Sequence, residues 1–279
     1  MTALALASLL GATVSTPVAA AESYENCAGF IDSLPATISK PGTWCLRKNL
    51  STSIASGNAL SITQSHVNLD CNGFQIDGLA AGPSADTRGI YVHHATYTVV
   101  RNCSVRGFRY GIELVGGQTN LIEDNLFQQN FQIGIKSYFA GSLVRRNRVI
   151  DTGGRPDASY SAGIFTQGDV VDNTVDGIFA ALPGDLEGIH VFSDRAALIR
   201  GNRVRNFVLN GGGHATAIVS FTESGNHLVI RNQVANSPTI KGGFVYISVY
   251  PPYCRGNDVA GLNGGLGYFC LAEFDNIVH

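Results

Sequence analysis

Short apolar runs alternate with polar positions along most of the chain, and one phrase recurs throughout. Two or three apolar residues are followed by one or two polar residues, an Asn, one variable residue and then Val or Phe, as in residues 143–149. The anchors of this phrase, which lie 22 to 30 residues apart, are Cys103 and then Asn125, Asn147, Asn173, Asn202, Asn232 and Asn257. Strand-forming residues around a fixed Asn at this period predict a solenoid.

A second phrase, Gly-Ile or a close variant, occurs once in each repeat. Its copies begin at Gly89, Gly111, Gly134, Gly163, Gly188, Ala217 and Gly243. No helical periodicity separates the two phrases, so each repeat is expected to hold two or three short strands joined by tight turns. Successive repeats would then stack as parallel strands about 4.8 Å apart. The pattern predicts an all-β solenoid of about eight coils in a single domain.

The recurrent Asn has a structural explanation. At a bend inside the solenoid, an Asn stacked on the Asn of the next coil can pass side-chain amide hydrogen bonds along the column. Cys103 replaces Asn at the first copy, where we expect a disulfide bond to Cys71. We therefore predict that this column is an internal ladder and that chemistry lies elsewhere.

With both phrases in place, residues 60–265 resemble the right-handed parallel β-helix repeat proteins of the pectate-lyase-like group. The resemblance implies the fold and says little about activity, because this fold hosts many activities. We expect a signal peptide at 1–21, an N-terminal cap at 22–58, the β-helix repeats at 59–265 and a C-terminal cap at 266–279. Caps are expected because the open ends of a solenoid expose apolar core.

Composition fits an exported protein of this kind. Of the 279 residues, 44% are hydrophobic and 14% are charged, which suits a long core, and the net charge of −2 gives no support for nucleic-acid binding. Residues 1–21 contain an apolar stretch that ends in small residues, as in secretory signals, although no Lys or Arg precedes Lys40. That stretch is too short to span a bilayer. We expect a secreted or periplasmic monomer without a membrane span.

Six Cys, an even number, favour an oxidising compartment. The expected pairs, of which the first and last would tie the two caps, are Cys27–Cys45, Cys71–Cys103 and Cys254–Cys270. The sequence alone leaves all fifteen connectivities open. A metal site is the alternative, and it is disfavoured because no two Cys have the spacing of a zinc knuckle.

Strand alternation places two columns of side chains on the outer face after each Gly-Ile. The first column is Tyr91, Glu113, Lys136, Phe165, His190 and Val219, and the second is His93, Val115, Tyr138, Gln167, Phe192 and Phe221. The connections before Gly-Ile vary in length, and insertions along one edge of a repeat protein usually frame its binding surface. They add a rim of Asp86, Arg88, Arg155, Asp157, Tyr160, Asp185, Glu187 and His214.

This face suits an extended polysaccharide, because aromatic rings stack on sugars and polar groups bind hydroxyls and carboxylates. The predicted substrate contacts are Tyr91, His93, Arg155, Phe165, Gln167 and Phe192. Cleavage of a uronate chain by β-elimination needs a positive group at the carboxylate, a base and an acid. The predicted catalytic residues are Lys136, Tyr138, His190 and Glu113. Arg155 would neutralise the carboxylate if its loop folds over the face.

Lys136 is the first choice of base, on the condition that burial or a nearby cation lowers its pKa. Because Glu113 lies one coil away in the same column, an exposed salt bridge of small energetic consequence is the competing interpretation. A hydrolase would need two carboxylates at one glycosidic bond, and Glu113 with Asp185 or Glu187 is the candidate pair. Neither the Asp triad of polygalacturonase-like enzymes nor the Asp-Pro-His motif of mannuronan epimerases is visible.

The metal is left open. Calcium is the metal that the resemblance suggests, and it prefers oxygen ligands, but the acidic residues Glu123, Asp124, Asp172 and Asp176 form no tight group in sequence. A further outward column, just before the Asn, contains Arg101, Glu123, Arg145, Arg200 and Arg255. Alternating charges there fit weak ion pairs on a solvated face better than a track for an acidic polymer.

The sequence thus predicts a secreted β-helix protein that acts on a polysaccharide, and in particular a lyase that cleaves an acidic, uronate-containing polysaccharide. The alternative is a β-helix that binds carbohydrate or belongs to the cell envelope without catalysis. A third class is a structural adhesin or part of a trimeric phage-type fibre, which the predicted caps at both ends disfavour.

Overall fold

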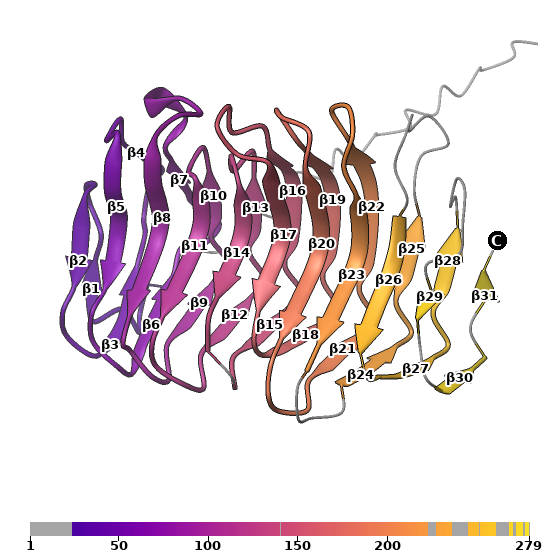
Figure 1. Cartoon of the computed structure of the whole chain (residues 1–279). Coiled ribbons are helices and arrows are strands. Elements are labelled where there is room, and N and C mark those ends of the chain that lie inside the picture. Colours follow the sequence, from indigo (N-terminus) through magenta and orange to yellow (C-terminus); the bar gives the residue numbers. More distant parts are fainter. Residues whose placement is uncertain are drawn as a thin grey trace, which may run out of the picture.

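The chain winds into a stack of β-coils. The computed structural model describes residues 24–139, 141–222, 227–235, 245–250, 252–260, 268–269, 272–275 and 277–278. Within these ranges the regular structure consists of short strands and one 3-10 helix, η1 (Leu79–Ala81). Figure 1 shows the coils side by side along a rod, from the N-terminal strands to the C-terminal ones. The predicted signal peptide, residues 1–21, lies outside the described residues.

The strands form three parallel sheets, and each complete coil adds one strand to each sheet. The Gly-Ile sheet, named for the phrase it carries, consists in the described residues of β2 (Ala36–Ile38), β5 (Ser56–Ile62), β8 (Asp86–His93), β11 (Tyr110–Val115), β14 (Ile133–Ser137), β17 (Tyr160–Thr166), β20 (Asp185–Phe192), β23 (Ala215–Phe221), β26 (Val245–Tyr250) and β29 (Tyr268–Phe269).

The other two sheets flank the Asn anchors. The Asn sheet, whose strands lead up to the anchors, consists in the described part of the chain of β1 (Gly29–Phe30), β3 (Gly42–Cys45), β6 (Val67–Asp70), β9 (Val99–Arg101), β12 (Leu121–Glu123), β15 (Leu143–Arg145), β18 (Asp169–Val171), β21 (Leu198–Arg200), β24 (His227–Ile230), β27 (Pro252–Arg255) and β30 (Ala272–Phe274). The third sheet consists, over the same described ranges, of β4 (Leu50–Ser51), β7 (Gln75–Asp77), β10 (Ser104–Arg106), β13 (Leu126–Gln128), β16 (Arg148–Gly153), β19 (Thr174–Phe179), β22 (Arg203–Val208), β25 (Gln233–Ala235), β28 (Asp258–Ala260) and β31 (Ile277–Val278).

The prediction of an all-β parallel solenoid of about eight coils is confirmed. Both segments predicted as caps also contribute strands: β1 to β4 lie within 22–58, and β29 to β31 lie within 266–279. These strands continue the three sheets, and a covering role for either segment stays a prediction.

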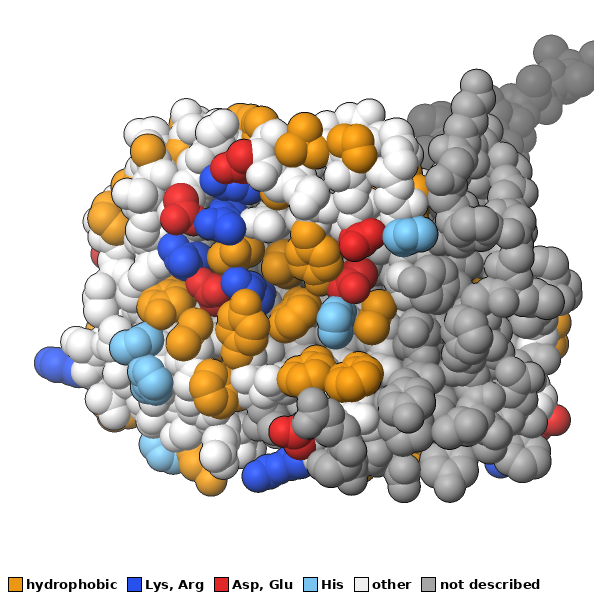
Figure 2. Space-filling view, in the orientation of Figure 1, with side chains coloured by type: hydrophobic (Ala, Val, Ile, Leu, Met, Phe, Trp, Pro, Cys, Tyr) orange, Lys and Arg blue, Asp and Glu red, His pale blue; other side chains and the backbone are white. Residues whose placement is uncertain are grey.

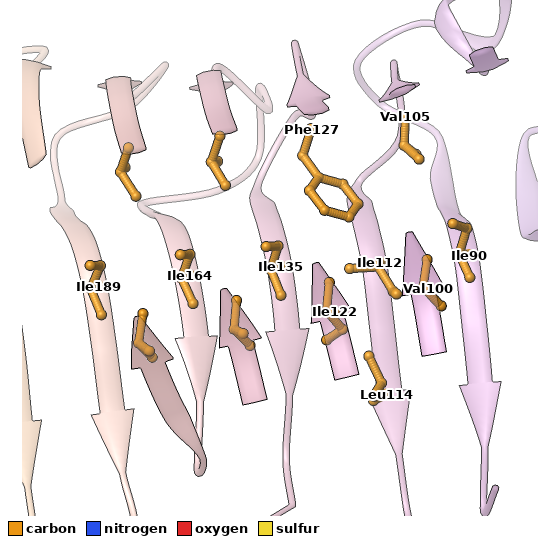
Figure 3. Close-up of a cluster of buried hydrophobic side chains, with 14 of the residues drawn as sticks. Ile90, Val100, Val105, Ile112, Leu114, Ile122, Phe127, Ile135, Ile164 and Ile189 are labelled. Atoms are coloured by element: carbon orange, nitrogen blue, oxygen red, sulfur yellow. The ribbon is translucent and has the colours of Figure 1, made fainter. Parts of the chain in front are cut away.

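The core is a column of aliphatic side chains that repeats with the coils. The Ile of the Gly-Ile phrase is fully buried in each coil, and Figure 3 shows Ile90, Ile112, Ile135, Ile164 and Ile189 in a row, one from each successive strand. Burying one such side chain contributes roughly 1.5–3 kcal/mol. Each coil therefore adds a similar increment of apolar burial, which is why the repeat can continue.

The Gly of the same phrase lies where neighbouring coils approach most closely. A Cβ at Gly111 would lie 2.6 Å from the carbonyl oxygen of Gly134, and a Cβ at Gly163 would lie 2.6 Å from that of Gly188. Carbon and oxygen atoms do not approach this closely without displacement of the backbone. The recurrent Gly is thus a steric requirement of the stacked coils.

The Asn anchors form the predicted ladder. In each rung Nδ2 donates to Oδ1 of the next anchor, over 3.0–3.1 Å, in an unbroken series from Asn125 to Asn257. Each Oδ1 from Asn147 onwards also accepts the backbone N–H of the anchor before it. At the first rung, Oδ1 of Asn125 accepts the backbone N–H of Cys103 at 2.9 Å. All these side chains are buried, so the ladder satisfies polar groups that water cannot reach.

Two of the three predicted disulfide bonds are present, Cys27–Cys45 and Cys71–Cys103. The third prediction involves Cys270, which lies outside the described residues. Over the described part of the chain, the structure contains no helix with the length and apolarity needed to cross a membrane.

Candidate functional site

The outer face of the Gly-Ile sheet carries the two predicted columns in register. Glu113 pairs with Tyr91 on one side and with Lys136 on the other, and the first column continues through Phe165 and His190. A third outward column, which strict alternation does not predict, precedes the Gly-Ile phrase and contains Arg88, Tyr110, Ile133, Ala162 and Glu187. Figure 2 shows this face, with charged side chains at the left, apolar side chains in the middle, and acidic and His side chains at the right.

A compact ion-pair cluster lies at the N-terminal end of this face. The carboxylate of Glu113 accepts from Arg88 Nε at 2.6 Å and from Lys136 Nζ at 2.9 Å. The side chains of Glu113 and Lys136 are only 5% and 10% exposed. The competing interpretation of a salt bridge is therefore correct in its partners, but the pair is buried instead of exposed.

Lys136 does not meet the condition set for a catalytic base. Burial acts to lower the pKa of Lys136, but hydrogen bonds with Glu113 and Tyr138 outweigh it, so the pKa is raised above its ordinary value. The ammonium also lies 3.9 Å from the centroid of the Tyr110 ring, a cation–π contact that favours the charged form. At neutral pH Lys136 is a fixed cation.

Aromatic side chains occupy the middle of the face. Phe165, between Lys136 and His190 in the first column, has its ring centroid 5.6 Å from that of Tyr138 and 4.7 Å from that of His190. Tyr138 is 40% exposed, so its ring is accessible to a ligand. Beyond this group, the rings of Phe192 and Phe221 stack in parallel at 5.5 Å. Rings on several adjacent coils offer stacking positions about 4.8 Å apart along the rod.

A His–carboxylate pair lies at the other end of the aromatic group. His190 Nδ1 lies 2.7 Å from Glu187 Oε2, and the hydroxyl of Tyr160 donates to the same oxygen. Burial, together with the negative charge of Glu187, raises the pKa of Tyr160, so this hydroxyl keeps its proton. Because the carboxylate oxygen is the acceptor, the proton of neutral His190 lies on Nδ1, which leaves the Nε2 lone pair for a substrate.

The sequence places Tyr160 on the rim and Glu187 both on the rim and in the candidate hydrolase pair, but it predicts no contact of either with His190. They were not connected to His190 because alternation within a strand puts residues 187 and 190 on opposite faces. The alternation of inward and outward side chains breaks at Gly188, so that Glu187 faces outward. It breaks in the same way at Gly89, because Arg88 also faces outward and donates to Glu113, the cross-strand neighbour of Tyr91. The missing Cβ of each Gly was the signal in the sequence that marked this irregularity.

Arg155 belongs to the loop between β16 and β17, which its contact with Ala85 ties to the chain just before β8, and coverage of the face by this loop stays a prediction. Its guanidinium donates to the carbonyl oxygen of Ala85 at 2.7 Å and pairs with Asp157 at 2.6 Å. The residue is 8% exposed. Its charge is therefore already compensated, and Arg155 fixes the loop.

The remaining predicted contacts lie along the same face. Tyr91 and His93 stack at 5.6 Å near its N-terminal end, while Gln167 directly follows β17, which carries Phe165, and Phe192 ends β20, which carries His190. Tyr91 and Gln167 are partly buried, and His93 is exposed. The structure thus places the predicted site residues on one surface, spread over five coils.

Two alternatives lose support from the geometry. Glu113 and Glu187 lie three strand steps apart, about 14 Å, which exceeds the separation of paired carboxylates in glycoside hydrolases. Three of the four acidic residues considered for calcium have other partners, since Glu123 and Asp124 pair with Arg146 and Asp176 pairs with Arg205. Within the described ranges, no group of three His, Cys, Asp or Glu side chains is arranged to hold a metal ion.

Solved structures with a similar fold come from several proteins. The Dettilon tailspike protein is 16% identical, with a TM-score of 0.44 over 88% of this chain and 60% of that chain. The mannuronan C-5 epimerase A-module of Azotobacter vinelandii is 8% identical, with a TM-score of 0.35 over 91% of both chains. The DFA-IIIase of Arthrobacter chlorophenolicus, in complex with GF2, is 13% identical, with a TM-score of 0.34 over 82% of this chain and 62% of that chain.

The chain therefore spans about 60% of the tailspike and DFA-IIIase chains. No relative was found among curated proteins. A family model described as the right handed beta helix region matches residues 48–204, which is more than half of the chain. The chain belongs to this right-handed β-helix family.

Proposed function

We propose that the protein is exported and acts on an acidic polysaccharide that lies along the outer face of the Gly-Ile sheet. One observation carries the proposal: a row of aromatic rings lies between a fixed cation, Lys136, and a His–carboxylate pair, His190 with Glu187. Aromatic faces stack on sugar rings, the cation attracts a uronate carboxylate, and the imidazole can move a proton. The disulfide bonds support export, because such bonds persist in oxidising compartments.

The spacing of these groups fits a sugar held over Phe165. Lys136 and His190 lie two strand steps apart, about 10 Å between Cα atoms, with Phe165 between them. An ammonium has three N–H donors, and one of them is directed at Glu113. Another donor would bind the carboxylate of a uronate, whose ring would stack on Phe165.

The reaction that we propose is β-elimination. His190 Nε2 would take the proton from the carbon next to the uronate carboxylate, while Lys136 stabilises the negative charge that develops on that carboxylate. The electron pair forms a carbon–carbon double bond, and the bond to the glycosidic oxygen breaks. The hydroxyl of Tyr138 would donate a proton to the departing oxygen. Glu187 orients the imidazole and stabilises it once it is protonated.

A second candidate, binding without catalysis, is favoured by one observation. Lys136, the first choice of base, is a buried and ion-paired cation, and this arrangement serves to hold a carboxylate as well as to activate one. The same aromatic row would then bind a polysaccharide that the protein leaves intact.

The two candidates are separated by an assay on a panel of alginate, pectate, glucuronan and glycosaminoglycans, with and without calcium. Lyase activity appears as ultraviolet absorbance of unsaturated uronate. We expect His190→Asn and Tyr138→Phe to lower the rate at least 100-fold, since general acid–base catalysis contributes roughly 10²–10⁴-fold. His66→Asn, away from this face, is the matched control and should leave the rate unchanged. Binding without any absorbance change on all polymers would refute the lyase and leave the binding protein.

A further inference from the structure

A separate pocket lies at the edge of the proposed polysaccharide face. It has a volume of about 280 Å³ and its polar walls come from Arg109, Gln132, Arg155, Asp157, Ser159 and Tyr160. Drug-sized ligands occupy pockets of roughly 300–1,000 Å³, so this pocket has room for one sugar unit and not for a length of polymer. All of its walls come from described residues on three successive coils.

The pocket is held open by contacts over a long sequence distance. Arg155 donates to the carbonyl oxygen of Ala85, which lies 70 residues earlier in the chain, and pairs with Asp157 in its own loop. Among the other lining residues, Arg109 Nε donates to the side-chain oxygen of Gln132 at 2.7 Å. A preformed pocket binds its ligand without the entropic cost of ordering a loop.

The charges around the pocket are compensated within the protein. Arg155 pairs with Asp157, and Arg109 pairs with Asp86 at 2.8 Å. An anion would enter beside the exposed carboxylate of Asp157, which opposes its binding. A hydroxyl group can instead donate to Asp157 and accept from Arg109 at the same time, because a hydroxyl is both donor and acceptor.

Tyr160 connects the pocket to the His–carboxylate pair. Its side chain forms a wall of the pocket, and its hydroxyl donates to Glu187, which binds His190. A sugar residue in the pocket would therefore lie beside Tyr160, with Tyr160 and Glu187 between it and His190.

We propose that this pocket binds one uncharged, hydroxyl-bearing sugar residue, which is the side branch or the chain end of the polysaccharide that lies on the adjacent face. The inference rests on the proposed function for the identity of the polymer. The pocket itself can be tested without any polymer. Its occupation would make the protein select heteropolysaccharides in which a neutral sugar is joined to an acidic backbone.

The test follows the backbone amide signals of the full chain by nuclear magnetic resonance. The chain is titrated with methyl glycosides of neutral hexoses and, separately, with methyl glycosides of uronates. Neutral glycosides should shift the signals of residues 109, 132 and 157–160 and should bind at least tenfold more tightly than uronates. Ser159→Trp fills the pocket and should weaken binding at least tenfold, whereas Arg148→Trp, on the exposed side of β16, should bind as the wild-type chain does. Gln132→Ala is a second variant, which removes a polar wall while keeping both Arg–Asp pairs.

The outcomes separate the two proposals. The pocket is refuted if no glycoside shifts these signals, if uronates bind better than neutral glycosides, or if both pocket variants titrate like the wild-type chain. Polymer binding, compared between the wild-type chain and Phe165→Ala, tests the polysaccharide face independently. Glycoside binding without polymer binding would uphold the pocket and refute the proposed function. Polymer binding without glycoside binding would uphold the proposed function and refute the pocket.

Discussion

The Asn ladder makes a quantitative prediction about stability. Asn173 lies in the middle of the ladder, and its side chain takes part in five hydrogen bonds. It donates to Val144 O, Val171 O and Asn202 Oδ1 at 2.9, 3.1 and 3.1 Å, and it accepts from the backbone N and the Nδ2 of Asn147 at 2.9 and 3.1 Å. We expect Asn173→Ala to destabilise the fold far more than removal of an exposed polar side chain.

The magnitude follows from the groups that lose their partners. Asn147 Nδ2 keeps its bond to Ile122 O, and Asn202 Oδ1 keeps the backbone N–H of residue 173, so these two groups remain satisfied. The buried backbone N–H of Asn147 loses its acceptor, which costs about 1–3 kcal/mol, and the other lost bonds and the small cavity add about 1–2 kcal/mol. The free energy of unfolding should fall by about 3 kcal/mol.

Guanidinium denaturation followed by far-ultraviolet circular dichroism measures this loss. The control is Arg148→Ala, because Arg148 is the exposed neighbour of a ladder residue and surface substitutions usually stay within about 0.5 kcal/mol. Both variants should keep the wild-type slope against denaturant. A loss below about 1 kcal/mol for Asn173→Ala would show that the ladder accompanies the fold without stabilising it.

Three further predictions concern stability. Gly163→Ala should destabilise by about 2 kcal/mol or more, because the added Cβ would lie 2.6 Å from Gly188 O and 2.5 Å from Val175 Cγ1; an unchanged melting temperature would contradict the steric account of the Gly-Ile phrase. Glu113→Ala should cost about 3 kcal/mol, since it leaves the buried Lys136 and the partly buried Arg88 without their carboxylate. Chemical denaturation would measure this loss, with Asp32→Ala, which removes an exposed ion pair to Arg47, as the comparison. Burial lowers the pKa of His227, so the unfolded chain binds the proton more readily and stability should fall as the pH drops below the ordinary value of 6.5. His227→Gln should flatten that fall, and identical pH profiles for the two chains would contradict it.

The fold could be predicted from the sequence because the residues that determine it recur in every coil. The Asn anchors and the Gly-Ile phrases each occupy one stacked position per coil, and a stacked position imposes the same packing and hydrogen-bonding demand every time. The pairing of Cys71 with Cys103 was also predictable, because both residues occupy inward-facing positions on adjacent coils. Repetition therefore carries most of the structural information in this chain.

The candidate site could be predicted only in part, because each of its residues occurs once and no repeat reveals its position. The row of Lys136, Phe165 and His190 came from simple alternation. The partners Glu187 and Tyr160 precede the Gly of their strands, where the alternation breaks, and the return of Arg155 to Ala85 depends on a loop whose path no local pattern determines. Burial of Glu113 and Lys136 likewise depends on neighbours from other coils, so the raised pKa of Lys136 could not be predicted.

The most direct test of the proposed polysaccharide face is equilibrium binding of acidic polysaccharides, measured by calorimetry on the wild-type chain, Phe165→Ala and the control Arg148→Ala. If the outer face of the Gly-Ile sheet is the binding surface, at least one uronate polymer binds the wild-type chain and the control equally. Phe165→Ala should then bind at least tenfold more weakly, a loss of about 1.4 kcal/mol. Equal affinity of all three chains would place binding elsewhere, and no binding to any acidic polymer would contradict the account.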